Sequence, residues 1–114
     1  MQEKIINILE KLVSYQSITP NDQGCQDFIA NYLQGLGFGI TKKKYDDVDN
    51  LIAKKGFGKP IIAFAGHTDV VPAGDVEKWN SNPFKLTKNK GNVVGRGVAD
   101  MKGSIACMLI AIEH

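Results

Sequence analysis

The chain has 114 residues, with 14 Lys or Arg against 12 Asp or Glu, a net charge of +2 and a hydrophobic content of 43%. This hydrophobic content excludes an intrinsically disordered chain, and so small a charge excess gives no reason to expect a nucleic-acid partner. No apolar run approaches the length that crosses a bilayer, and no signal segment opens the chain, so we expect a cytoplasmic protein without a membrane partner.

Three segments have the apolar periodicity of amphipathic helices. The first lies near the N-terminus, with Ile5, Ile8, Leu9, Leu12 and Val13 on one face. The second is expected to begin at Thr19-Pro20-Asn21-Asp22, with Thr19 as its N-cap, and to end at a glycine-rich stretch. Its apolar stripe is Cys25, Phe28, Ile29, Tyr32, Leu33 and Leu36. The third covers 102–114, with Ile105, Met108, Leu109 and Ile112 on its apolar face.

The remaining segments predict strands and one long loop. Residues 40–45 and 50–55 read as two strands joined by the turn 46–49. The apolar run 60–65 is typical of a strand that helices cover on both faces of a sheet. Residues 72–98, rich in Gly, Pro, Asn and Asp, predict a functional loop containing a short hairpin at 85–94. Helices alternating with strands in this way indicate an α/β fold.

Two further features bear on the chain as a whole. Cys25 and Cys107 lack metal-binding spacing and fall inside predicted helices, so we expect both to be reduced and buried. The last helix runs to His114 without a glycine, a proline or a polar tail. We therefore expect the chain to be part of a longer protein.

The segment Gly66-His67-Thr68-Asp69 directly follows the predicted buried strand. Ligands of open α/β sheets gather beyond the carboxyl ends of the strands. In extended backbone, His67 and Asp69 point to the same face, so the carboxylate can hold one ring nitrogen while the other binds a metal. A surface histidine without a function is an equally good interpretation of this spacing alone.

Asp100 is the second candidate, inside Gly95-Arg96-Gly97-Val98-Ala99-Asp100-Met101-Lys102-Gly103. At the start of the last predicted helix, an aspartate most often serves as an N-cap. The flanking glycines let backbone approach closely, and a carboxylate can also bridge two metal ions. Two ligands fall short of a zinc site, which takes three or four from the protein.

Several motifs together resemble the aminoacylase/carboxypeptidase family of dinuclear zinc hydrolases. They are GHTDVVPAGD, a following Trp and Pro-Phe, GRGVADMKGSIA, and the upstream segments ITPNDQGCQDFI and LGFGI. The resemblance thus covers nearly the whole chain. It is strongest to those members that hydrolyse N-succinyl-L,L-diaminopimelate to succinate and L,L-diaminopimelate.

This resemblance implies a site and a fold. His67 would be a ligand of one zinc ion, Asp100 the carboxylate that bridges two zinc ions, and Asp69 the catalytic residue whose carboxylate supports His67. Cobalt is possible in place of one zinc. A cis peptide between Asp100 and Met101 is implied as well. Residues 1–114 would be the N-terminal portion of the catalytic domain, a three-layer sandwich whose mixed, largely parallel sheet is flanked by helices. The whole enzyme would be a homodimer with a separate dimerisation domain.

The family's general-base Glu and its other metal ligands follow the region that matches this chain. We therefore expect residues 1–114 alone to be inactive. Within the family, the alternatives are an acetylornithine deacetylase or an aminoacylase, which share the same motifs. A non-catalytic α/β interaction module is the alternative from another class.

Overall fold

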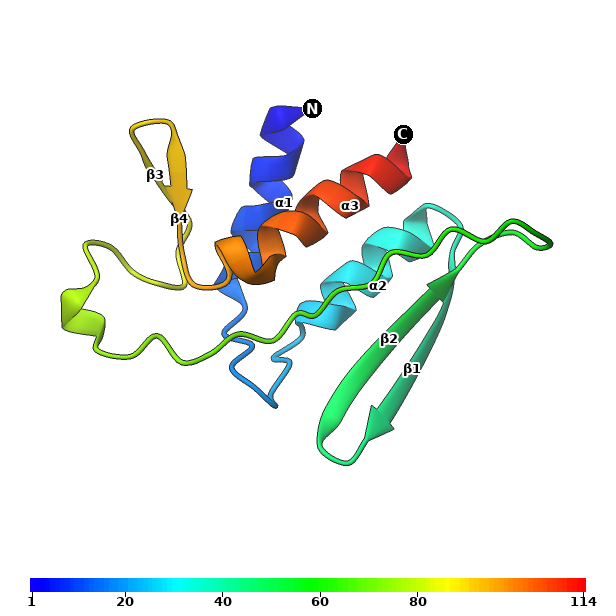
Figure 1. The fold of residues 1–114 in the computed structure, drawn as a ribbon, viewed down its shortest axis with the longest axis horizontal. Helices are drawn as coiled ribbons and strands as arrows, with labels where there is room; N and C mark the ends of the chain where they lie inside the picture. Colours follow the sequence, from blue (N-terminus) through cyan, green and yellow to red (C-terminus); the bar gives the residue numbers. More distant parts are fainter.

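A computed structural model describes residues 1–114. In chain order it has helices α1 (Gln2–Ser14) and α2 (Cys25–Gly35), then strands β1 (Gly39–Tyr45) and β2 (Val48–Lys54). A short turn of helix η1 (Val76–Lys78) and strands β3 (Thr87–Asn89) and β4 (Asn92–Val94) follow. The chain closes with the wide turn η2 (Val98–Lys102) and helix α3 (Gly103–Glu113) (Figure 1).

The three helices enclose the hydrophobic core. Its buried members come from α1, α2, α3 and one position beside β3, and they are Ile8, Leu9, Leu12, Val13, Cys25, Ile29, Leu33, Leu86, Ile105, Ala106, Leu109 and Ile110. The two termini lie close together (Figure 1), and Lys4 of α1 pairs with Glu113 of α3 at 2.8 Å. The apolar periodicity therefore predicted all three helices and most of their buried faces.

Helix α2 begins later than the sequence predicts. Thr19 does not cap it, because turns at 19–20 and 23–24 come before the helix, whose N-cap is Gly24. The acid of the same motif contacts the helix instead, since Asp22 Oδ2 accepts a hydrogen bond from the backbone N–H of Gln26 at 2.9 Å. The prediction of a start at Thr19 was wrong by about one and a half turns.

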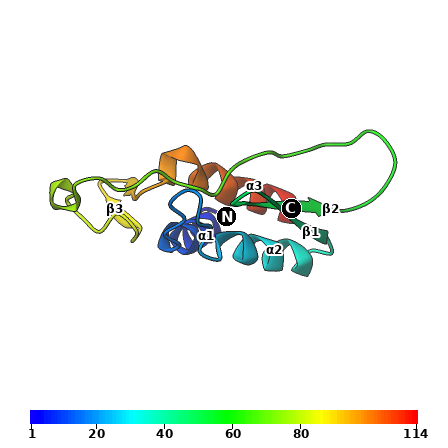
Figure 2. The ribbon, with the colours of Figure 1, turned by 90° about the horizontal axis from the view of Figure 1, so that it is seen from below.

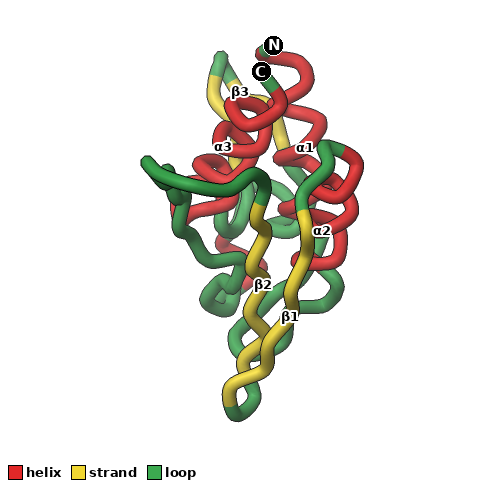
Figure 3. The backbone as a smooth tube through the Cα atoms, turned by 90° about the vertical axis from the view of Figure 1, so that its right-hand side faces the viewer, coloured by secondary structure: helices red, strands yellow, loops and turns green.

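Strands β1 and β2 form an antiparallel hairpin, as the sequence predicts, but β2 begins already at Val48, inside the predicted turn 46–49. The register pairs Gly39 with Lys54 and Tyr45 with Val48, which leaves Asp46 and Asp47 as the turn. The hairpin projects from the helical part of the molecule beside α2 (Figure 3). Strands β3 and β4 form a second, separate antiparallel pair inside the long loop, as expected.

The expected buried strand at 60–65 is not formed. These residues pair with no strand, and the side chains of Ile61, Ile62 and Phe64 are exposed, Ile62 at 83%. In Figure 2 the segment that follows β2 bows away from the helices before the chain returns to them. The physical reason is that residues 60–65 have no neighbouring strand to pair with, because β1 pairs only with β2. The segment that follows them makes one parallel bridge, between Ile18 and Val70. The structure has two small antiparallel sheets and does not display a three-layer sandwich around a parallel sheet.

The long loop is held together by its single tryptophan and the single arginine. Trp79 Nε1 donates to the carbonyl oxygen of Ala73 at 3.0 Å, and the Arg96 guanidinium lies 5.2 Å from the centre of the Trp79 ring. The backbone N–H of Arg96 donates to Pro83 at 2.6 Å. These contacts of Trp79 and Pro83 hold the two ends of the loop together. No helix of the structure combines the length and the apolarity needed to span a bilayer.

The two cysteines differ, which corrects the expectation that both are buried. Cys25 is fully buried, and this desolvation raises the pKa of its thiol to about 11, whereas Cys107 lies on the exposed side of α3. Because the thiolate is the reactive form, iodoacetamide at pH 8 is expected to alkylate Cys107 and to leave Cys25 unmodified in the folded chain. Peptide mass spectrometry with and without urea measures this. Equal labelling of both residues without urea would contradict the packing of α2.

Candidate functional site

The backbone of Gly66 passes directly over the turn that contains Asp100. A Cβ atom at Gly66 would lie 3.1 Å from Met101 Cε and 3.6 Å from Ile105 Cγ1. Only glycine leaves room for so close an approach without a shift of the neighbouring side chain. This approach sets His67, the next residue, above the turn η2. It explains how two residues 33 positions apart in the sequence come together.

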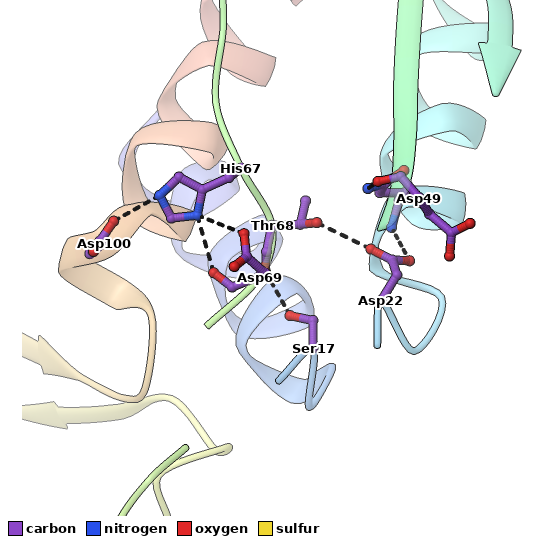
Figure 4. Close-up of polar contacts among 8 residues, drawn as sticks. Ser17, Asp22, Asp49, His67, Thr68, Asp69 and Asp100 are labelled. Atoms are coloured by element: carbon purple, nitrogen blue, oxygen red, sulfur yellow. Dashed lines mark hydrogen bonds and ion pairs between the residues drawn. The ribbon is translucent and has the colours of Figure 1, made fainter. Parts of the chain in front are cut away.

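The His67 ring lies between two aspartates (Figure 4). Its Nδ1 atom is 3.1 Å from the backbone oxygen of Asp69 and 3.2 Å from Asp69 Oδ1. Its Nε2 atom is 2.9 Å from Asp100 Oδ1. The side chains of His67, Asp69 and Asp100 therefore come together, although residues 60–65 form no strand and Asp100 does not begin a helix.

Asp100 does not serve as a helix cap. The N-cap of α3 is Lys102, and no side chain caps this helix. Backbone torsions at Asp100 and Met101 are not helical, and the peptide bond between them is cis, as the family resemblance implied. The Asp100 side chain is 86% exposed and turned toward His67. The simple N-cap interpretation was wrong for this residue.

The electrostatics of the pair favour a positive charge at His67 Nε2. Partial burial of the ring lowers the pKa of His67, but the hydrogen bond to the Asp69 backbone and the charges of Asp69 and Asp100 outweigh it and raise the pKa overall. Either a proton or a metal ion at Nε2 satisfies this demand, and metal binding requires that the proton leave. The Asp69 contact at Nδ1 keeps Nε2 as the nitrogen that faces Asp100.

The donor set is one that zinc accepts. Imidazole nitrogen and carboxylate oxygen bind zinc at about 2.0–2.2 Å, so two such atoms 2.9 Å apart can contact one ion. His67 and Asp100 are the residues that would hold it. Asp69 and Asp100 contact different nitrogens of the His67 ring. The structure contains no group of three or more His, Cys, Asp or Glu side chains that could together hold one metal ion.

A network on the opposite side of the segment holds His67 and Asp69 in place. The residue between them, Thr68, accepts a hydrogen bond at its carbonyl oxygen from Ser17 Oγ (2.7 Å) and donates its hydroxyl to Asp22 Oδ1 (3.1 Å) (Figure 4). Val70 continues this contact, since its N–H donates to Ser17 and its carbonyl accepts from Thr19. Residues 17–22 thus supply the backbone support that a neighbouring strand would give.

No sequence motif pointed to the members of this network. Ser17 had no recognisable motif, and Asp22 was interpreted only as part of a helix start. Lys102 was missed as well: it is fully buried, its Nζ atom donates to backbone carbonyls of α1, and burial lowers its pKa. The signal that could have pointed to Lys102 is its position at the start of an almost entirely apolar helix.

Comparison with known proteins bears on this site directly. Residues 63–114, which include His67, Asp69 and Asp100, match Peptidase family M20/M25/M40. A curated succinyl-diaminopimelate desuccinylase from Pseudoalteromonas atlantica is 50% identical over 113 residues, 99% of this chain. The chain spans 30% of the length of that relative.

A solved structure has a similar fold over nearly the whole chain. The crystal structure of human carnosine dipeptidase 1 superposes with a TM-score of 0.85 at 25% sequence identity, covering 98% of this chain and 28% of that protein. The resemblance indicated by the motifs is therefore confirmed: the chain is similar over nearly its whole length to a succinyl-diaminopimelate desuccinylase, and residues 63–114 carry the match to Peptidase family M20/M25/M40.

Proposed function

We propose that this chain forms part of the active site of a zinc-dependent amide hydrolase. The observation that carries the proposal is the contact of His67 Nε2 with Asp100 Oδ1, made by two residues from distant parts of the sequence. An imidazole and a carboxylate in contact at an exposed position have no evident packing role. The match of this region to a peptidase family supports the same chemistry.

His67 and Asp100 would hold the metal, with Asp100 bridging two zinc ions and cobalt able to replace one of them. When bound, zinc supplies a water of lowered pKa and polarises the scissile carbonyl. The residues of this chain do the positioning: Asp69 holds the His67 ring by its Nδ1 edge, and Asp100 presents an oxygen on the other side. The general base would come from outside residues 1–114.

The substrate that we propose is N-succinyl-L,L-diaminopimelate, hydrolysed to succinate and L,L-diaminopimelate in the cytoplasm. The support is the 50% identity to a desuccinylase, a protein whose length this chain covers by 30%. Residues 1–114 would then be the N-terminal portion of a catalytic domain in a homodimer. In that domain, further strands would pair with residues 60–65 and complete a three-layer sandwich with a largely parallel sheet.

The test is an assay of a longer protein that contains this chain, with N-succinyl-L,L-diaminopimelate, N-acetylornithine and an N-acyl amino acid as substrates. Activity on the succinylated amide that chelation removes and zinc restores is the expected result. Preference for an acetylated substrate would reassign the protein within the family. Failure to hydrolyse any amide in the presence of zinc would contradict the proposal and favour an interaction module.

A substitution at Asp69 separates support of His67 from metal binding. Asp69→Asn in the longer protein is expected to retain bound zinc but to lose activity by about 10–100-fold, as losses of a ligand's hydrogen-bond partner do. The lower end is expected, because the backbone oxygen of Asp69 still accepts from His67 Nδ1 at 3.1 Å. Metal analysis and kcat on the same sample measure both effects. Asp75→Asn, in the distant loop, is the control, and unchanged turnover in the Asp69 variant would reduce its role to a structural one.

A further inference from the structure

Lys102 is a buried cation without a carboxylate partner. Its side chain is 0% exposed, yet it forms no salt bridge. Its Nζ atom instead lies 2.8 Å from the carbonyl oxygen of Leu12 and 2.8 Å from that of Tyr15, at the C-terminal end of α1. Burial of a charge is costly unless hydrogen bonds compensate it, and the last carbonyls of a helix carry a partial negative charge. The end of α1 is therefore the group that holds this cation.

The path of the side chain is fixed along its length. Gly97 adopts a φ of +84°, and a Cβ atom there would lie 3.4 Å from Lys102 Cδ and 2.5 Å from Val70 Cγ1. The backbone N–H of Lys102 donates to the carbonyl of Gly97 at 2.8 Å. Both the stem and the backbone of Lys102 are thus packed against the glycine segment that leads into η2.

Asp100 has no comparable anchor of its own. Its exposed side chain contacts only His67 among the charged groups, so its position is set by the backbone of η2. Lys102, two residues further on, connects that backbone to the end of α1 through its hydrogen bonds to the carbonyl oxygens of Leu12 and Tyr15. Ser17, two residues beyond Tyr15, donates a hydrogen bond to the carbonyl oxygen of Thr68, the residue next to His67. One short stretch, residues 12–17, therefore holds both halves of the pair.

We propose that Lys102 is a positioning residue, which holds Asp100 against His67 by binding the C-terminal carbonyls of α1. A role of this positioning in hydrolysis rests on the proposed function. The effect of Lys102 on the contact between His67 and Asp100 does not rest on it. A lysine that only stabilised the packing of α1 on α3 would lower the free energy of unfolding when replaced and would leave the His67 ring environment unchanged. The ring of His67 is thus the place to measure.

The experiment records the ring ¹⁵N shifts of His67 by NMR in the 114-residue chain at one fixed pH. Lys102→Met removes the Nζ atom and retains most of the stem. It is expected to move the His67 Nε2 shift to the value of Asp100→Asn, and the double variant is expected to show no further change. Lys11→Met is the matched control, because Lys11 lies in the last turn of α1 but is exposed above the Tyr15 ring. A folded Lys102→Met chain with the wild-type His67 shift would overturn the proposal.

Lys102→Met removes a buried hydrogen-bonding group and can unfold the chain. In that case Lys102→Gln, which is shorter but still a hydrogen-bond donor, is recorded in sucrose, which favours the folded state. A shift of His67 Nε2 part of the way toward the Asp100→Asn value is expected, and a wild-type shift in the folded variant would overturn the proposal. Lack of amide hydrolysis by the longer protein would contradict the proposed function and leave this NMR result standing.

Discussion

Replacement of His67 by alanine is expected to lower amide hydrolysis by the longer protein by more than about 100-fold. Loss of the hydrogen-bond partner of a metal ligand alone lowers activity or metal affinity by about 10–100-fold. Loss of the ligand itself is expected to lower activity further. The ring is also the group that links Asp69 and Asp100, since its two nitrogens contact one carboxylate each. Removal leaves these two aspartates without a shared partner. Steady-state turnover and zinc content of the purified variant measure the effect.

His114→Ala is the matched control for this experiment. It removes the other histidine of the chain, which is exposed at the end of α3 and contacts neither aspartate. Its turnover and zinc content are expected to equal those of the unsubstituted protein. A His67→Ala variant with full turnover, or one that retains all its zinc, would show that the contact with Asp100 is an ordinary surface ion pair.

The parts of the fold that the sequence predicts are those decided by local pattern. The helical faces containing Leu12, Leu33 and Leu109 follow from spacing alone, and all three residues are buried. The hairpin β1–β2 follows from two extended segments around a short polar turn. The prediction of a strand at 60–65 was wrong because strand formation there does not depend on local pattern alone. Its apolar run indicates burial, but burial needs neighbouring strands, and no local pattern reveals whether these are present.

The candidate site divides in the same way. Spacing placed His67 and Asp69 on one face, and their contact is confirmed. The support from Ser17 and Lys102 depends on contacts over 51 and 90 positions of sequence, and no local pattern predicts the partner of either residue. Asp100 lies between the two cases. Its flanking glycines indicated a close backbone approach, whereas its position at the start of the last predicted helix favoured an N-cap, which the structure lacks.

The second large effect concerns stability and tests the core and the exposed segment in one experiment. Leu12 is fully buried in the core that α1 and α3 share, so Leu12→Ala is expected to lower the free energy of unfolding of the 114-residue chain by about 2–5 kcal/mol. Ile62→Ala, a matched loss of an aliphatic side chain at an exposed position, is expected to stay within about 0.5 kcal/mol. Urea denaturation followed by circular dichroism measures both, with the unsubstituted chain as reference. A large loss in Ile62→Ala would show that residues 60–65 are buried in the isolated chain after all, and a small loss in Leu12→Ala would contradict the three-helix core.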